Sequence, residues 1–114
     1  MIVKRSEMKS ENRKEMRGGA GEVDIIHMAA SDSMKNARLM AELTLSPGSG
    51  IGPHRHDKET EYYIILEGSG IVIEDDGTKT VGEGDIVITG NGQSHSIENT
   101  GDQPLRFHAI IITE

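Results

Sequence analysis

The stretch PGSGIGPHRHDKETEYYIILEG, residues 47 to 68, decides the fold that this sequence predicts. Its first half is rich in glycine and proline, which mark turns. Its last part is an apolar run that ends at Gly68, as a short strand does. Between these parts lie His54, His56 and Glu61. We therefore expect a turn, a strand that carries the two histidines, and a second strand that begins near the carboxylate.

The spacing of these residues allows their side chains to meet. Residues two apart in a strand point to the same face, so His54 and His56 can aim two imidazoles at one point. Glu61 opens the next strand segment, where its carboxylate can reach the same point. His95 follows a glycine-flanked turn much later in the chain. If that part of the chain folds back, three ring nitrogens and one carboxylate oxygen converge.

Such a set of side chains predicts a site for one divalent metal ion per chain. Imidazole suits iron, nickel, copper and zinc, and a carboxylate shifts the preference toward manganese and iron. Four protein ligands leave positions open on an octahedral ion, as a metal that binds or activates a ligand requires. With one carboxylate ligand the ion keeps a net positive charge and should attract a bidentate anion. Among manganese, iron, zinc and nickel we favour manganese.

The rest of the chain predicts short antiparallel strands. Glycine-marked turns and an Asp-Gly hairpin turn at residues 76–77 separate apolar or alternating segments of strand length. These segments are residues 22–29, 38–45, 61–68, 70–75, 78–84, 85–90, 95–100 and 104–113. Strands of this length and spacing predict an all-β sandwich or barrel.

The length of 114 residues suits one domain. We expect residues 23–114 to form the barrel and residues 1–22, which are polar and charged, to form a solvated N-terminal arm. Residues 8–17 of the arm could form one or two helical turns before glycines end them. An alternative for residues 1–5 is pairing as a strand with a partner subunit.

The composition excludes several classes of function. The net charge of −7 and the lack of a basic stripe predict no nucleic-acid partner. No apolar run approaches the ~20 residues of a membrane-spanning helix, so we expect no membrane partner. The N-terminus has no apolar signal core followed by a cleavage site. The absence of cysteine excludes disulfides and thiolate chemistry, and it predicts a cytoplasmic protein.

The histidine doublet and its surroundings resemble the cupin family. The first cupin motif, G-x5-H-x-H-x3,4-E-x6-G, is matched by Gly48, His54, His56, Glu61 and Gly68. The second motif, G-x5-P-x-G-x2-H-x3-N, is matched by Gly84, Gly92, His95 and Asn99. Gly90 stands where the family usually has proline, which leaves the turn less restricted. Nine of the ten fixed positions therefore fall in register between residues 48 and 99.

The resemblance implies a fold, a ligand set and a range of functions. The fold would be a double-stranded β-helix of the jelly-roll type, with the metal ion inside the barrel mouth. Many cupins are homodimers, and those with this ligand set include oxalate decarboxylases, dioxygenases and sugar-acid or sugar-phosphate enzymes. We thus expect a protein that binds or acts on a small carboxylate, polyol or dicarbonyl ligand, with an oxalate-like acid favoured. The alternative is a non-catalytic, metal-anchored sensor of a sugar or metabolite.

Two further residues are candidates for a catalytic role. Tyr63 shares the strand face of the carboxylate ligand, so its phenol could line the same cavity, or its ring could pack in the core. Glu42 lies in mid-strand, where a buried carboxylate must be paired or functional. It could act as a pocket acid or base. We expect Tyr62 to pack in the core, and His27 and His108 to be exposed or satisfied by local partners.

Overall fold

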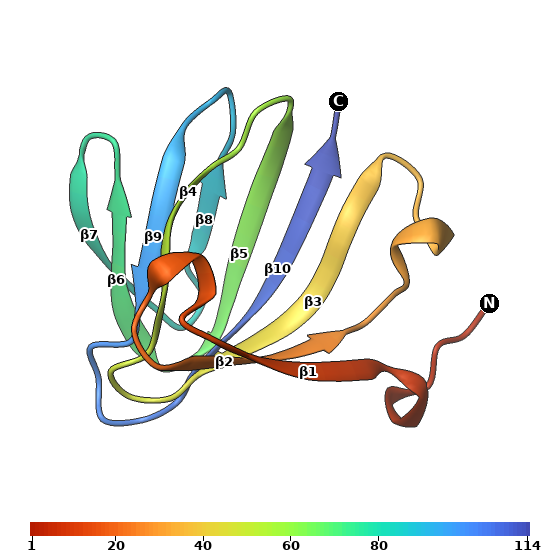
Figure 1. Ribbon diagram of the computed structural model, residues 1–114, viewed down its shortest axis with the longest axis horizontal. Coiled ribbons are helices and arrows are strands. Elements are labelled where there is room, and N and C mark those ends of the chain that lie inside the picture. Colours follow the sequence, from red (N-terminus) through yellow and green to blue (C-terminus); the bar gives the residue numbers. More distant parts are fainter.

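The computed structural model describes all 114 residues and places ten strands in two antiparallel sheets that face each other (Figure 1). The larger sheet has the order β1-β2-β3-β10-β5-β8 and the smaller has the order β4-β9-β6-β7. The strands are β1 Lys9–Lys14, β2 Glu22–His27, β3 Ala37–Leu45, β4 Gly50–Arg55, β5 Glu59–Glu67, β6 Ser69–Glu74, β7 Gly77–Gly82, β8 Ile86–Thr89, β9 Ser94–Glu98 and β10 Leu105–Thr113. The predicted all-β jelly roll is confirmed.

The core lies between the two sheets and follows the two-residue period of the strands. In β10 the inward residues Leu105, Phe107 and Ala109 are fully buried, while the residues between them are partly exposed. Because successive side chains point to opposite faces, a slip of one residue would turn this buried set toward solvent. Burying each large aliphatic or aromatic side chain stabilises the fold by about 1.5–3 kcal/mol. The apolar pattern therefore fixes the register as well as the fold.

The N-terminal arm differs from the sequence prediction. Residues 9–14 form β1, an edge strand that pairs antiparallel with β2, instead of helical turns. Helix propensity is a weak preference that tertiary pairing overrides. The only helical segments are the short 3-10 turns η1 Arg5–Glu7, η2 Met16–Gly18 and η3 Ser31–Ser33, and none of them could cross a membrane. Residues 1–4 form no strand within the chain, so their pairing with a partner stays a prediction.

The end of the arm packs closely on β4. The backbone N–H of Gly50 donates to the carbonyl of Ala20 at 2.9 Å. A Cβ atom on Gly52 would lie 2.0 Å from the carbonyl oxygen of Arg17, and one on Gly19 would lie 2.4 Å from that of Gly50. Glycine at positions 19 and 52 is thus what allows the two backbones to touch. In Figure 1 this part of the arm crosses in front of the barrel, with η2 against β4.

Strand β4 contains a bulge just before the first histidine of the doublet. Ile51 pairs with Ile97 of β9, and His54 pairs with His95, so three steps along β4 match two steps along β9. The extra residue turns both Ile51 and His54 toward the interior. Bulges of this kind often re-aim a side chain beside a functional site.

Candidate metal centre

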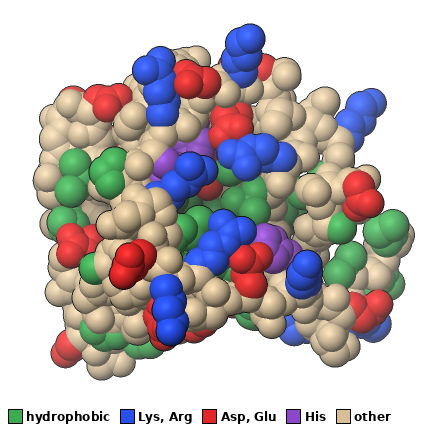
Figure 2. Space-filling view, in the orientation of Figure 1, with side chains coloured by type: hydrophobic (Ala, Val, Ile, Leu, Met, Phe, Trp, Pro, Cys, Tyr) green, Lys and Arg blue, Asp and Glu red, His purple; other side chains and the backbone are tan.

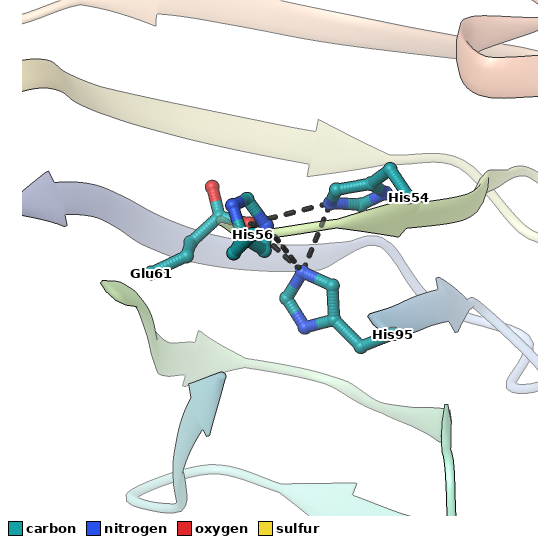
Figure 3. A group of neighbouring side chains, drawn as sticks. All are labelled: His54, His56, Glu61 and His95. Atoms are coloured by element: carbon teal, nitrogen blue, oxygen red, sulfur yellow. Dashed lines mark hydrogen bonds and ion pairs between the residues drawn. The ribbon is translucent and has the colours of Figure 1, made fainter. Parts of the chain in front are cut away.

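Four side chains from three strands meet inside the barrel (Figure 3). His54 comes from β4, His56 follows the end of that strand, Glu61 lies on β5 and His95 on β9. The Nε2 atom of His95 lies 2.9 Å from Nε2 of His54 and 3.1 Å from Nε2 of His56. Oε1 of Glu61 lies 2.9 Å from Nε2 of both His56 and His95. All four ligand atoms lie within 4.8 Å of one another.

The other ring nitrogen of each histidine has its own partner. Nδ1 of His54 donates to the carbonyl of Gly52 at 2.8 Å, and Nδ1 of His56 donates to the carboxylate of Glu59 at 2.6 Å. A neutral imidazole that carries its proton on Nδ1 has a lone pair on Nε2. Two such lone pairs and a carboxylate oxygen therefore point at one another, and they repel unless a cation lies between them. The donor set fits a divalent metal ion.

The surroundings of His95 complete the site. Thr89 places its Oγ1 2.8 Å from Nδ1 of His95, and the ring of Tyr63 stacks on the imidazole with centroids 4.8 Å apart. These contacts leave Nε2 as the nitrogen that faces the other three ligand atoms. One ring face and both nitrogens of His95 thus have named neighbours, and the partner on Nδ1 orients the ring as in ligating histidines.

The electrostatics of the four residues favour a positive charge at the centre of the site. Burial opposes the ionisation of Glu61, but hydrogen bonds from the three histidines outweigh it and hold the pKa of Glu61 well below its usual range. Burial lowers the pKa of His95, which keeps that ring neutral. The hydrogen bond to Glu61 raises the pKa of His56. A positive charge, whether a proton or a metal ion, is therefore stabilised beside the Glu61 carboxylate.

Tyr63 lines the same cavity as His54, His56 and Glu61, and it also packs in the core. Only 1% of its surface is exposed, and its ring touches Phe107 as well as His95. Burial raises the pKa of Tyr63 well above its ordinary value, so the phenol stays protonated. Its neighbour Tyr62 faces outward and is half-buried. The expectation that Tyr62 packs in the core was wrong, because the inward face of β5 is the one that carries Glu61.

The side chain of Glu42 lies on the opposite face of the larger sheet from that of Glu61. Its carboxylate contacts the guanidinium groups of Arg5 at 2.7 Å and Arg106 at 3.4 Å, and it lies 3.4 Å from Nε2 of His108. Arg5 thereby ties the N-terminal arm to β3. Glu42 is buried and paired, and it does not line the cavity. His108 has a local partner, as expected.

The cavity in front of the four residues has a volume of about 130 Å³. Half of its lining is apolar, with Leu39 and Leu43 among these residues, and basic side chains outnumber Glu61 in the polar half. In Figure 2 lysine and arginine side chains surround a hollow in this face, with hydrophobic and histidine side chains visible inside it. The basic residues of the lining are Arg13, Arg17, Arg38 and His27. The cavity is thus small and suited to an anion.

Two acidic residues hold parts of this basic lining in place. Glu59 accepts two hydrogen bonds from Arg38, at 2.7 and 2.8 Å, in addition to the one from His56. The bonds from Arg38 hold the pKa of Glu59 at about 2. Glu11 bonds Arg13 at 2.6 Å and Nε2 of His27 at 2.7 Å. Each acid therefore joins a cavity residue to a neighbour.

Sequence reasoning missed the contribution of the arm to this cavity. Arg13 and Arg17 lie in a segment that was expected to be solvated, and His27 had been expected to be exposed or satisfied nearby. His27 does have a local partner in Glu11, but its ring also lines the cavity. The glycines at positions 19 and 52 were the available signal, because such residues permit close backbone contact.

Comparison with known proteins places the chain in a family. The family model described as "Cupin domain" matches residues 41–111. This chain is a cupin. The cupin is 44% identical over 113 residues to a Thermotoga maritima protein named "Oxalate-binding protein", with 98% of this chain and 93% of that protein covered. A crystal structure of a predicted oxalate decarboxylase from Thermotoga maritima matches with a TM-score of 0.94 and 43% identity, over 100% of both chains.

A more distant structure shares the fold alone. The polyketide cyclase RemF from Streptomyces resistomycificus matches with a TM-score of 0.77 at 22% identity, over 100% of this cupin and 80% of that chain.

The position where this cupin departs from the family motif has a local explanation. A Cβ atom on Gly90 would lie 2.6 Å from Oγ1 of Thr60 and 3.1 Å from the carbonyl oxygen of Glu59. The loop before His95 packs so closely on β5 that glycine fits there best.

Proposed function

We propose that this cupin binds a small dicarboxylate, of which oxalate is the simplest, through one divalent metal ion held by His54, His56, Glu61 and His95. The observation that carries the proposal is the convergence of these four ligand atoms beside a small cavity that His54, His56 and Glu61 line together with basic residues. The ion would supply a positive charge and open coordination positions to the ligand. The name of the Thermotoga maritima relative supports the same class of ligand.

The size and lining of the cavity favour oxalate over a sugar. The cavity beside His54, His56 and Glu61 is small, at about 130 Å³. Oxalate has six heavy atoms, whereas a hexose has twice as many. Leu39, Leu43 and Ile51 on the wall offer no partner for sugar hydroxyls, and a buried hydroxyl without a hydrogen bond is costly. These features count against the sugar-sensor alternative.

We propose manganese as the ion. The carboxylate of Glu61 shifts the preference of the donor set toward harder ions. Zinc prefers four ligands, so four protein donors would leave it no position for oxalate. Manganese takes six ligands and keeps two positions for the two oxygens of a chelating acid. The manganese-loaded protein should therefore bind oxalate more tightly than the zinc-loaded protein.

Binding without turnover is the function that the cavity supports best. Decarboxylation of oxalate requires delivery of a proton to carbon as carbon dioxide leaves. Glu61, a metal ligand, is the only acidic residue among those that line the cavity. Decarboxylation is the second candidate, and the observation that favours it is His27, whose ring lines the cavity and bonds Glu11.

Calorimetry and NMR test these functions together. Protein loaded with Mn²⁺ is titrated with oxalate, and the same sample is followed by ¹³C NMR for formate and carbon dioxide. We expect one ion per chain and saturable oxalate binding that requires the ion, with no formate. Equal oxalate binding by metal-free protein, or none by the loaded protein, would contradict the proposal. Formate production that disappears in His27→Gln would establish the second candidate.

We also propose that two copies of the chain pair through the outer face of the larger sheet. Ile88 of β8 lies beside Tyr62 of β5, which lies beside Ile110 and then Met40 on the following strands. This apolar row crosses four strands, and Ile88 is 58% exposed in the single chain. Contiguous apolar surface of this kind usually marks an interface. A twofold axis would place the row against its own copy.

A further inference from the structure

Arg17 is the cation of the cavity that has no acidic partner. Arg13 and Arg38, which also line the cavity, are paired with Glu11 and Glu59 at 2.6 and 2.7 Å. No carboxylate lies within 4.0 Å of the Arg17 guanidinium group, and no protein atom accepts a hydrogen bond from it. Arg17 therefore brings an uncompensated positive charge to the lining of the cavity.

The backbone holds Arg17 in an unusual conformation. Its φ of 54° and ψ of 27° lie in the left-handed region, which costs a residue other than glycine of order 1–3 kcal/mol. The segment is kept there by N–H bonds from Gly18 to the carbonyl of Glu15 and from Gly19 to that of Met16, both at 2.9 Å. The contact with Gly52 on β4 fixes its distance from the metal centre. Residues held at such a cost are concentrated at ligand-binding sites.

The charges of the site leave a place for one more cation. A divalent ion bound to the Glu61 carboxylate and three neutral imidazoles keeps one positive charge. A dicarboxylate dianion reverses that charge and leaves one negative charge in the cavity. The pairs that contain Arg13 and Arg38 are already neutral. The guanidinium of Arg17 is the group that brings the cavity to neutrality, and it would do so for a dianion and not for a monoanion.

We propose that Arg17 determines specificity for dicarboxylates by binding the edge of the ligand that faces away from the metal ion. The inference rests on the proposed function. Oxalate that gives the ion one oxygen from each carboxylate keeps one oxygen of each free, on its opposite edge. A guanidinium group presents two parallel N–H donors that match two such oxygens. Glyoxylate, which lacks the second carboxylate, offers only one oxygen there.

The test compares four forms of the manganese-loaded protein by calorimetry with oxalate and with glyoxylate. They are the unchanged chain, Arg17→Gln, Arg17→Lys and Arg55→Gln. The last removes the same charge from a residue that pairs with Asp57 and does not line the cavity. Metal content by elemental analysis and the free energy of unfolding in urea are also measured for each form. Arg17 forms no hydrogen bond or ion pair with the four ligands, so both quantities should stay the same in its variants.

Arg17→Gln should weaken oxalate binding by about ten- to a hundredfold, the loss expected for charged hydrogen bonds. Glyoxylate binding should change less than about threefold, and the metal content should stay the same. Arg17→Lys keeps the charge without the paired donors, so its oxalate affinity should lie between those of the unchanged chain and Arg17→Gln. Arg55→Gln should match the unchanged chain.

Two results would overturn the inference, and they are distinguishable from each other. Oxalate affinity that is equal in Arg17→Gln and the unchanged chain, or an equal loss for glyoxylate, would remove the role of Arg17 and leave the proposed function intact. Failure of the unchanged, metal-loaded chain to bind oxalate would remove both.

Discussion

His54 on β4 and His95 on β9 are paired across the smaller sheet with their Nε2 atoms 2.9 Å apart, although 41 positions separate them in the sequence. Their meeting depends on the bulge between Ile51 and His54, because a regular strand would turn one of those two side chains outward. The register that buries the core is therefore also the register that brings the four candidate ligands together.

Metal binding should stabilise the fold, because the four ligand atoms converge only in the folded chain. At 100 times its dissociation constant, Mn²⁺ should raise the free energy of unfolding by about 2.7 kcal/mol. His95→Ala should abolish most of this rise. The matched control is His108→Ala, on the outer face of the larger sheet, which should keep it. Urea unfolding with and without Mn²⁺ measures the difference, and an equal rise in both variants would place the ion elsewhere.

Glu59 should raise the affinity of the site for metal without contacting the ion. Its carboxylate accepts the Nδ1 proton of His56 and two hydrogen bonds from Arg38. Glu59→Gln should lower the affinity for Mn²⁺ by about 10- to 100-fold, as losses of such partners usually do. Glu67→Gln, at the exposed end of the same strand, is the control and should have little effect. Competition with a fluorescent chelator gives both affinities, and equal values would show that Glu59 does not orient the ring.

Glu11 should make the fold sensitive to acid. Its hydrogen bond with Arg13, followed by that with His27, lowers the pKa of Glu11 from 4.5 to about 2. A carboxyl group whose pKa is lower in the folded chain stabilises the fold above pH 4.5 and loses this contribution as the pH falls toward 2. Glu11→Gln should therefore flatten the dependence of unfolding free energy on pH in that range.

The control for this measurement is Glu83→Gln, because Glu83 is exposed and in no ion pair. It should keep the slope of the unchanged chain. Urea unfolding at intervals between pH 2 and pH 6 supplies the curves. A slope in Glu11→Gln as steep as that of the control would mean that the ion pair contributes nothing.

The contact between the arm and β4 should be intolerant of a side chain. Gly52→Ala would place a methyl group 2.0 Å from the carbonyl oxygen of Arg17, so the arm must move away. We expect a loss of about 1–3 kcal/mol in the free energy of unfolding, as overpacking usually causes. Gly82→Ala meets nothing closer than 4.0 Å and should be nearly neutral. Weaker oxalate binding by Gly52→Ala with unchanged metal content would show that the arm carries ligand contacts, and unchanged oxalate binding would contradict this.

The outer face of the larger sheet should govern the oligomeric state. Ile88→Lys would place a charge in the apolar row, so light scattering after size-exclusion chromatography should report a monomer for this variant and a dimer for the unchanged chain. Ile73→Lys is the control, since Ile73 is 46% exposed on the smaller sheet. A dimer that survives Ile88→Lys, or a monomer in the unchanged chain, would exclude this interface.

The sequence predicted most of the fold and three of the four candidate ligands from short-range regularities, whereas His95 was predicted from the second cupin motif. The two-residue period marked the strands, and the spacing between His54 and Glu61 marked the site. The same period placed Tyr63 beside Glu61. The burial of Glu42 could not be predicted in this way, because it depends on pairing with Arg5 and Arg106, which lie far away in the sequence.

The structure of the N-terminal arm was not predicted, for a different reason. Its charged residues lie on an edge strand, where pairing with β2 requires no apolar pattern, and charged edges are common in sheets. The position of Arg17 depends on backbone contacts with β4, which are formed between residues more than 30 positions apart. No local sequence pattern can indicate a contact between residues so far apart in the chain.

An anomalous difference map from crystals grown with Mn²⁺ and oxalate tests the central claim most directly. We predict one manganese peak per chain, bonded to Nε2 of His54, His56 and His95 and to the carboxylate of Glu61, with oxalate on the remaining positions. A peak elsewhere, or His95 turned away from the other three residues in the loaded protein, would contradict it.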